Sequence, residues 1–331
     1  MTAMESREQI LEAALRLVGE GLIARTWGNI SARVSDTQFL ITPSGLAYET
    51  LRAEQLVLVN IADGTYQGDI KPSSEKGIHA DAYRLRPEVN FVIHTHQYWA
   101  SVAGVAGTAL TGFRHPLLGK RVPCAAYGLP GTKRLRRAVE TEERAWPDCR
   151  AFLLRSHGAL CLGRDREDAF TIARALEEVC EERVRDWMGE MPSAEASPVL
   201  EKLCAAAPEG LCALCETSPE VLAVSRRGRR LRPYLDDLAQ IAGVDVLCVP
   251  PEPQRVQRAL RSRNAVLVLG AGAICAADTE SETEAVRTLL RKGCAAKLYA
   301  DAAGGCRPLG AADAALQRLV YQRSYKRKAQ C

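Results

Sequence analysis

The chain has 331 residues, of which 47% are hydrophobic and 25% are charged. This balance is typical of a globular protein, and at about 150 residues per domain the length predicts two domains. The net charge of +4 and the aromatic content of 5% argue against a surface that binds nucleic acid. We therefore expect no nucleic-acid partner.

No apolar run reaches the roughly 20 residues that are needed to cross a bilayer. Residues 1–17 carry charges at helical spacing, unlike a signal peptide. We therefore expect no membrane partner and a cytoplasmic protein, in which the 12 cysteines remain thiols. Cys212 and Cys215 form a CxxC pair, but without a second pair a core or surface thiol is favoured over a zinc site.

The N-terminal part of the chain begins with a predicted helix at residues 4–20, where apolar side chains recur at helical spacing. A turn at Gly28 and Asn29 follows and leads into an alternating strand. Both residues tolerate unusual backbone angles, and free N–H groups at such a turn can bind an anion.

Two further strands are predicted at residues 39–41 and 56–61. The first is closed by a turn that contains Ser44 and Gly45, so a hydroxyl and a glycine lie together. The second is followed by an Asp-Gly hairpin signal.

A polar loop at residues 71–75 enters the next predicted helix. Ser73 or Ser74 suits the N-cap, and Glu75 is expected in the first turn. Because a helix N-terminus presents unpaired N–H groups, the two serines could hold a phosphate.

A short apolar run at residues 91–93 predicts a buried strand that leads into His94 and His96. Alternate residues of a strand point to the same face, so both imidazoles project to one side. Taken alone, this spacing is more often structural than metal-binding. The chain has only five histidines, and His157 follows a second apolar strand at a turn. Three imidazoles and Glu75 form a ligand set suited to Zn²⁺ or another divalent ion.

The remaining pattern of the first half predicts helices and short strands in alternation. Helices are expected at residues 98–106, 131–145 and 165–186, a short strand at 122–125, and two strands joined by a tight turn within 151–161. Residues 190–200 have the composition of a linker.

Beyond this linker the chain partly repeats itself. Residues 218–224 resemble residues 86–92, and residues 265–275 resemble the segment that ends at 156–161. This alignment places His94 on Arg226, His96 on Gly228 and His157 on Ala271. It predicts a truncated, metal-free second copy, although shared strand–turn–helix patterning could also produce two short matches.

Two more motifs of the second half can each be interpreted in two ways. Gly270 and Gly272 follow an apolar strand, but a dinucleotide fingerprint would need a third glycine, so the repeat is favoured. The basic run at residues 226–232 could bind a polyanion. A solvated loop, or one paired with acidic residues such as Asp236 and Asp237, is favoured.

The motifs of the first half together resemble the class II aldolase/adducin family, in the family order over about residues 5–190. The stretches that carry the resemblance are residues 26–31, 42–45, 72–75, 79, 83–89, 94–96 and 156–158. The resemblance implies an α/β fold with αβα layers, in which helices flank a central, mostly antiparallel β-sheet. We expect this metal-binding domain at residues 1–190 and the degenerate partial repeat at 191–331.

The family also implies a metal centre and a phosphate site. His94, His96 and His157 are expected to bind a divalent metal, usually zinc. Glu75 is expected to be a fourth ligand and the catalytic, proton-transferring group. The residues implied for the phosphate are Gly28, Asn29, Ser44, Gly45, Ser73 and Ser74.

The activity implied by this resemblance is a metal-dependent lyase reaction. A ketose phosphate is cleaved by a retro-aldol step to dihydroxyacetone phosphate and an aldehyde, in a homo-oligomer. The family leaves open a sugar-phosphate dehydratase, an epimerase or a non-catalytic, adducin-like assembly protein, and Glu75 disfavours the epimerase branch. The tyrosine that aldolases of the family place after the histidine pair has no clear counterpart here; His115 lies nearest and could relay protons or remain a solvated loop residue.

Overall fold

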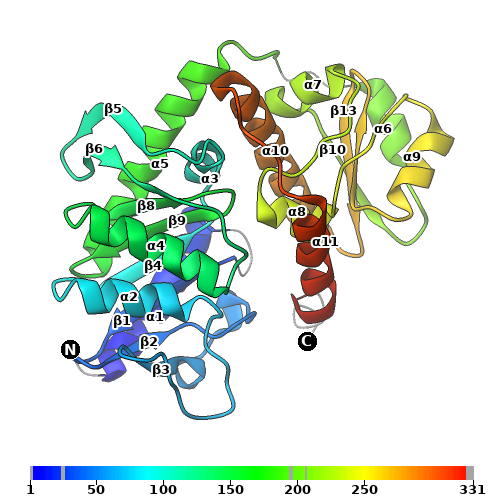
Figure 1. The fold of residues 1–331 in the computed structure, drawn as a ribbon. Coiled ribbons are helices and arrows are strands. Elements are labelled where there is room, and N and C mark those ends of the chain that lie inside the picture. Colours follow the sequence, from blue (N-terminus) through cyan, green and yellow to red (C-terminus); the bar gives the residue numbers. More distant parts are fainter. Residues whose placement is uncertain (1–2, 24–26, 194–196, 206, 326–331) are drawn as a thin grey trace. The chain divides into compact units, whose positions relative to one another are not determined.

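The computed structural model describes residues 3–23, 27–193, 197–205 and 207–325. The chain divides into two compact units, an N-terminal unit up to Glu182 and a C-terminal unit at Arg183–Ser324 (Figure 1). The division falls inside a helix, α5 (Arg166–Met188). The predicted domain boundary at residue 190 stays a prediction.

The N-terminal unit is an α/β structure around a seven-stranded sheet in the order β3-β2-β1-β4-β9-β8-β7. All neighbouring strands are antiparallel except β7 and β8, which confirms the predicted mostly antiparallel sheet. A separate hairpin joins β5 to β6. The strands are β1 (Gly28–Arg33), β2 (Gln38–Ile41), β3 (Val57–Asn60), β4 (Phe91–Thr95), β5 (Leu110–His115), β6 (Gly119–Val122), β7 (Cys124–Ala125), β8 (Ala151–Leu154) and β9 (Gly158–Gly163).

Helices cover both faces of this sheet. Helices α2 and α4 pack together on one face, and α1 and α5 lie on the other, where Arg16 stacks 4.2 Å from the Phe170 ring (Figure 1). The core between α2, α4 and the sheet includes the fully buried side chains of Tyr83, Phe39 and Phe152. The helices are α1 (Ala3–Gly19), α2 (Lys76–Leu85), α3 (Tyr98–Gly104), α4 (Lys133–Ala145) and α5, with 3₁₀ turns at Tyr48–Thr50 and Ala53–Gln55.

The start of α2 differs from the prediction by one position. Glu75 is the N-cap residue and Lys76 the first helical residue, so Glu75 does not lie in the first turn. The Ser73 hydroxyl accepts a hydrogen bond from the Glu75 backbone N–H at 3.2 Å, and the Ser73 carbonyl accepts one from Lys76. These two bonds turn the chain into the helix while Glu75 still has a non-helical backbone.

The C-terminal unit contains a four-stranded sheet in the order β10-β13-β12-β11, in which only β11 and β12 are parallel. Its strands are β10 (Cys212–Glu216), β11 (Cys248–Val249), β12 (Ala265–Val268) and β13 (Gly272–Ala277). Its helices are α6 (Pro198–Ala205), α7 (Pro219–Arg226), α8 (Asp236–Ala242), α9 (Pro253–Leu260), α10 (Glu280–Ala303) and α11 (Ala311–Val320), followed by a π-helical turn at Tyr321–Tyr325. The predicted linker at 190–200 includes residues 194–196, which lie outside the described residues, and α6 begins within it.

This order and these strand directions match those of β4-β9-β8-β7 in the N-terminal unit. The match shows that one predicted alignment was wrong. Pro219 begins α7, as Tyr98 begins α3, so the strand that corresponds to β4 is β10 and lies before residue 218. The position of His94 is therefore that of Cys215, not Arg226, and the position of His96 is that of Thr217, not Gly228.

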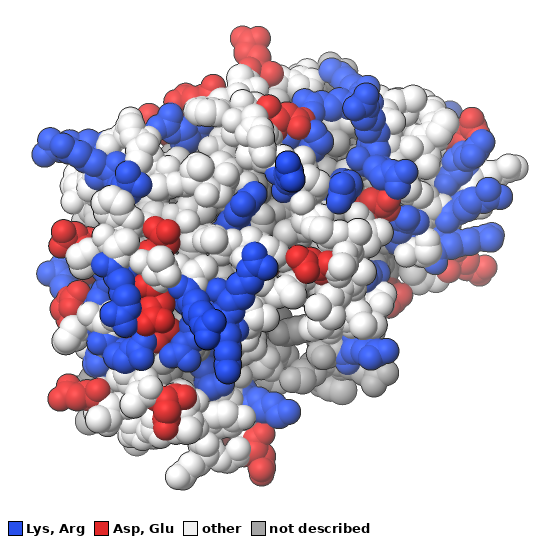
Figure 2. All heavy atoms as spheres, in the orientation of Figure 1, with Lys and Arg blue, Asp and Glu red and all other residues white. Residues whose placement is uncertain are grey.

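The other motifs of the second half have structural roles. In the basic run, Arg227 pairs with Asp301 and Arg230 with Asp245, so the loop is paired with acidic side chains from elsewhere in the unit. Asp237 forms a buried ion pair with Lys292. Figure 2 shows basic and acidic side chains interspersed over the visible face.

No described helix is long and apolar enough to span a membrane.

Candidate metal centre

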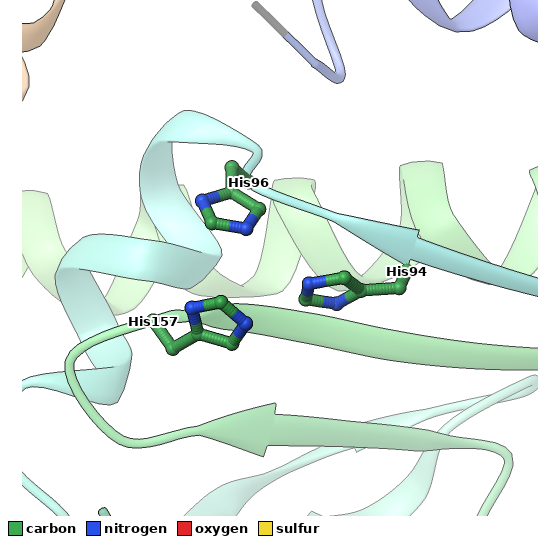
Figure 3. Close-up of side chains that lie close together, drawn as sticks. All are labelled: His94, His96 and His157. Carbon is green, nitrogen blue, oxygen red and sulfur yellow. The ribbon is translucent and has the colours of Figure 1, made fainter. Parts of the chain in front are cut away.

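Three histidines from separate parts of the N-terminal unit come together where the neighbouring central strands β4 and β9 meet the loops of the sheet. His94 and His96 lie at the end of β4, and His157 lies in the turn between β8 and β9 (Figure 3). One nitrogen of each ring lies within 4.8 Å of the others, and all three side chains are buried. Within the described residues, no other group of histidine, cysteine and acidic side chains meets this geometry, and the pair Cys212/Cys215 is not part of one.

The backbone of the β8–β9 turn brings His157 to this place. Ser156 has a positive φ of 60°, a conformation that side-chain-bearing residues rarely adopt. Gly158 then runs so close to β4 that an added Cβ atom would lie 2.1 Å from the Thr95 carbonyl oxygen. Only a glycine allows the two strands to approach in this way, so the steric fit explains Gly158, while Ser156 adopts a conformation that is unfavourable for a serine.

His94 is oriented by a hydrogen bond behind the cluster. Its Nδ1 lies 2.8 Å from the carbonyl oxygen of Ala159, its diagonal neighbour on β9. Because a carbonyl can only accept, Nδ1 carries a hydrogen, and Nε2 is the nitrogen that faces the cluster. Ligating histidines are held in this manner by a backbone carbonyl or a carboxylate.

The Glu75 carboxylate lies between two of the rings. Its Oε1 is 2.9 Å from His157 Nε2, and its Oε2 is 3.2 Å from His94 Nε2. Burial raises the pKa of Glu75, but the neighbouring His94 and His157 outweigh this and hold the pKa well below its usual range. An ionised carboxylate beside three imidazoles is a donor set that fits a divalent transition metal.

The Asn29 side chain holds Glu75 from the other side. Its Nδ2 donates to Glu75 Oε2 at 3.0 Å, and its Oδ1 is hydrogen-bonded to His79. Sequence reasoning missed this role of both residues. The signal was present, because His79 follows Glu75 by four residues and therefore lies on the same face of α2.

The turns expected to bind phosphate are joined to one another near Glu75. The Ser44 N–H donates to the Lys71 carbonyl at 3.0 Å, and the Ser73 N–H donates to the Thr42 carbonyl at 3.0 Å. The residues of the predicted phosphate site are therefore close in space, with Ser74 exposed and Ser73 buried. Phosphate binding itself stays a prediction.

Gly28 is tied to the same region from β1. Tyr48 donates its hydroxyl hydrogen to the Gly28 carbonyl at 2.9 Å, which connects the segment after Gly45 to the start of the strand. Gly28 has a φ of 122°, and an added Cβ atom would lie 2.7 Å from the His94 carbonyl oxygen. Glycine is thus required here by the approach of β1 to β4.

A cavity of about 210 Å³ opens beside Glu75, between the starts of α2 and α4. Ser74 lines it, as do the basic side chains of Lys76, Lys133 and Arg136. Arg136 is already paired with Asp81 at 2.6 Å, so the two lysines contribute the remaining positive charge. His115 lies apart from the metal cluster in the β5–β6 hairpin, where its Nδ1 accepts from the Leu117 N–H at 3.2 Å.

Residues 8–184 match the model of the class II aldolase and adducin N-terminal domain. A 5-deoxy-D-ribulose 1-phosphate aldolase from Bacillus thuringiensis serovar kurstaki is 33% identical over 180 residues, which cover 54% of this chain and 83% of that protein. A 5-methylthioribulose-1-phosphate/5-deoxyribulose-1-phosphate aldolase from Rhodospirillum rubrum is 34% identical over 203 residues, covering 59% of this chain and 90% of that one.

Solved structures with a similar fold include L-fuculose-1-phosphate aldolase from Thermus thermophilus, with 28% identity, a TM-score of 0.47, and coverage of 56% of this chain and 97% of that one. They also include YgbL from Escherichia coli, which is titled a putative aldolase/epimerase/decarboxylase, with 25% identity, a TM-score of 0.49, and coverage of 59% and 95%.

On the family match and the two aldolase relatives, the chain belongs to the class II aldolase and adducin family and is a class II aldolase, a lyase.

Proposed function

We propose that this protein cleaves a ketose 1-phosphate, specifically a 5-deoxypentulose 1-phosphate, to dihydroxyacetone phosphate and a short aldehyde. The observation that carries the proposal is the Glu75 carboxylate between His94 and His157, with His96 closing the cluster. The substrate class is supported by the names of the two curated relatives, both of which are aldolases of 5-deoxyribulose 1-phosphate.

His94, His96, His157 and Glu75 would hold the divalent ion, which we propose to be zinc. When bound, such an ion supplies Lewis-acid polarisation of the substrate oxygens. A cytoplasmic location and a homo-oligomeric assembly belong to the same proposal and are supported by the family resemblance.

The reaction needs one proton transfer at each of two atoms. The C4 hydroxyl loses its proton as the C3–C4 bond breaks, and the electron pair of that bond moves through C3 toward the C2 carbonyl. The resulting enediolate of dihydroxyacetone phosphate is then protonated at C3. We assign both transfers to Glu75, which accepts the hydroxyl proton and returns a proton to C3, so that no other reactant is consumed.

The substrate phosphate would be held by the three joined turns. Backbone N–H groups of Gly45 and of the turn at Gly28 and Asn29, and the hydroxyls of Ser44, Ser73 and Ser74, offer donors of the kind that a phosphate requires. Their proximity to Glu75 would place C3 and C4 of a bound ketose phosphate within reach of the carboxylate.

We also propose that the C-terminal unit is a partial copy of the N-terminal one, without the metal site. The β8–β9 turn and the β12–β13 turn are closed by equivalent backbone hydrogen bonds. The His157 N–H donates to the Leu154 carbonyl at 3.0 Å, and the Ala271 N–H donates to the Val268 carbonyl at 3.0 Å. In each unit, a glycine directly after this turn approaches a neighbouring carbonyl too closely for a Cβ atom.

A second correspondence involves a cysteine at the edge strand of each sheet. Cys124 on β7 lies with its sulfur 3.9 Å from the Gly104 carbonyl at the end of α3. Cys248 on β11 lies with its sulfur 3.7 Å from the Ser225 carbonyl near the end of α7. Shared side-chain contacts at matching places favour a common origin over chance similarity of strand–turn–helix patterns.

The experiment is a cleavage assay on a panel of ketose 1-phosphates that includes 5-deoxyribulose 1-phosphate and L-fuculose 1-phosphate. We expect dihydroxyacetone phosphate to be released most rapidly from the 5-deoxypentulose phosphate, with turnover lost on chelation and restored by zinc. Glu75→Gln should bind substrate yet fail to turn it over. A folded, zinc-loaded protein that cleaves no member of the panel would contradict the proposal, and a dehydrated ketone product would instead assign it to the dehydratases.

A further inference from the structure

Four buried side chains form a continuous hydrogen-bonded row behind Glu75. Tyr83 OH lies 2.7 Å from Ser31 Oγ, and Ser31 Oγ lies 2.7 Å from His79 Nδ1. His79 Nε2 is bonded to Asn29 Oδ1, and Asn29 Nδ2 lies 3.0 Å from Glu75 Oε2. We propose that His79 is a positioning residue that orients the Glu75 carboxylate through the Asn29 amide, an inference that rests on the proposed function.

The direction of each bond in this row follows from its chemistry. The ionised Glu75 carboxylate can only accept, so the Asn29 amide nitrogen faces it and donates. Asn29 Oδ1 then faces His79 and must accept, so His79 Nε2 carries the hydrogen. Burial, followed by the influence of His94, lowers the pKa of His79 to about 3, so the ring is neutral.

The far end of the row completes this assignment. In a neutral His79 with the hydrogen on Nε2, Nδ1 must accept, and it does so from the Ser31 hydroxyl. The Ser31 oxygen in turn accepts from Tyr83 OH. Each group therefore has one allowed role, and the row has a single polarity from Tyr83 to Glu75.

This polarity matters because an amide group can rotate by half a turn with little change in shape. Without His79, the oxygen of Asn29 could turn toward the Glu75 carboxylate, where two acceptors would repel each other. The His79 N–H holds the amide the other way, so Glu75 Oε2 keeps a donor and Oε1 points to His157. Outer partners that orient a ligating or proton-transferring side chain commonly matter by about 10- to 100-fold in affinity or activity.

The sequence encodes the row with two simple spacings. Asn29 and Ser31 alternate on β1 and so point to one side of the strand, while Glu75, His79 and Tyr83 recur every four residues on α2 or at its N-cap. All of them are buried in the described structure. One strand face and one helix face therefore meet along a line of polar groups inside an otherwise apolar layer.

The test compares variants that break the row at different points, using zinc-saturated protein. His79→Leu, which keeps a similar volume without either nitrogen, should lower kcat by about 10- to 100-fold with little change in KM. His79→Gln can still donate to Asn29 and should retain activity within about 5-fold of wild type by the same reasoning. A purely structural role for His79 would lower the amount of folded protein without this split between kcat and KM.

Ser31→Ala is the second variant, because it removes one hydroxyl and adds no volume to the core. It removes the donor that fixes the His79 tautomer, and we expect a kcat reduction of about 3- to 10-fold. The matched control is Ser101→Ala, a fully buried serine on α3 that is outside the row and is expected to leave kcat unchanged.

Zinc affinity, measured by competition with a chromogenic chelator, gives a readout that is independent of any substrate. A displaced Glu75 should weaken zinc binding by about 10-fold in His79→Leu and less in Ser31→Ala. If wild type cleaves no ketose phosphate, the proposed function fails while this measurement still tests the row. Wild-type kcat and zinc affinity in both His79→Leu and Ser31→Ala would overturn the inference.

Discussion

The four strands of the C-terminal unit have the same order and directions as β4-β9-β8-β7 of the N-terminal unit, but the two units differ at the strand ends where the first carries its histidines. The positions of His94, His96 and His157 correspond to those of Cys215, Thr217 and Ala271, as judged from strand order and register. The turn of the second unit has a matching backbone hydrogen bond although the corresponding positions hold no imidazoles. This turn geometry therefore does not require metal ligands.

The difference between the turns concerns backbone strain. Ser156 precedes His157 with a φ of 60°, whereas the corresponding Gly270 has a φ of 70°. Glycine adopts this conformation without strain, and a serine does so at a cost of about 1 kcal/mol. The strained residue is found beside the histidine, and the relaxed one is found where the ligand is absent, as expected if a functional site maintains strain that a scaffold does not need.

The first unit also contains elements for which the second has no described counterpart. Strand β1 and helix α2 supply Asn29 and Glu75, and the four-stranded sheet ends at β10, in the place of β4. Three imidazoles alone would therefore not restore the site in the second unit, because the carboxylate would still be missing. This contrast leads to four predictions, in order of decreasing effect.

Removal of a ligand should have the largest effect. We expect His157→Ala to lose stoichiometric zinc and at least about 100-fold in activity, since loss of a direct ligand should exceed the effect of losing an outer partner. Ala271→Ser at the corresponding position of the second unit is the control and should keep both. Metal analysis and the cleavage assay measure the outcome, and unchanged zinc content in His157→Ala would contradict the assignment of the metal centre.

The second prediction concerns the replacement by alanine of the glycine after each turn, Gly158 in the first unit and Gly272 in the second. An added Cβ atom would lie 2.1 Å from the Thr95 carbonyl at Gly158 and 2.5 Å from the Glu216 carbonyl at Gly272. Each Gly→Ala change should lower the free energy of unfolding by about 3 kcal/mol, as overpacking forces strands apart. Only Gly158→Ala should also reduce zinc binding. Urea unfolding and metal analysis measure the two effects, and equal zinc loss in both variants would show that the units do not act separately.

The sequence predicts the three histidine ligands only through its motifs in combination. The spacing of His94 and His96 alone is more often structural, and the resemblance of all the motifs to the family selected the three histidines that the structure brings together. Pattern reasoning did less well with Asn29, since a polar residue at a strand start was interpreted as part of an anion-binding turn. Its side chain in fact lies between Glu75 and His79, a contact that depends on the packing of β1 against α2.

The repeat was harder to align from sequence for a related reason. The match of residues 218–224 with 86–92 rests on a shared Pro-Glu-Val, yet proline also favours the first turn of a helix. In the structure Pro219 begins α7, while Pro87 lies in the loop before β4. A short motif that suits two local structures cannot fix the register of an alignment. The turn at residues 268–272 is a better marker, because Gly272, like Gly158, lies too close to a neighbouring carbonyl to carry a Cβ atom.

The third prediction concerns Glu143, which lies in the last turn of α4. Its side chain is buried, and neither carboxylate oxygen has a hydrogen-bond partner among the described residues. Burial raises its pKa to about 8, which the nearby Arg86 only partly offsets.

A raised pKa means that the folded state binds this proton more tightly than the unfolded state. The stabilisation is fully present below the ordinary pKa of 4.5 and is lost as the pH rises through about 8. We expect the free energy of unfolding to fall by a few kcal/mol across this window in wild type but to change less in Glu143→Gln. Urea unfolding at several pH values measures the slope, and identical slopes in the two proteins would contradict the prediction.

The smallest expected effects are those of the equivalent helix caps at the starts of α5 and α10. The Asp165 carboxylate accepts from the Asp168 N–H at 2.8 Å, and the Thr279 hydroxyl accepts from the Glu282 N–H at 3.2 Å. Replacing either cap with alanine should cost about 1 kcal/mol of stability.

The caps differ in charge, and this allows a finer test of the comparison. The Asp165 carboxylate also interacts with the positive end of the α5 dipole, which adds about 0.5 kcal/mol at low ionic strength and is screened by salt. Asp165→Ala should therefore cost more than Thr279→Ala in dilute buffer, and the gap should close in about 1 M salt, where the Debye length is about 3 Å. Unfolding curves at two salt concentrations measure the gap. A gap that persists in high salt would mean that the caps differ in hydrogen-bond geometry and not in charge, and the two helix starts would then be less alike than their matching cap positions indicate.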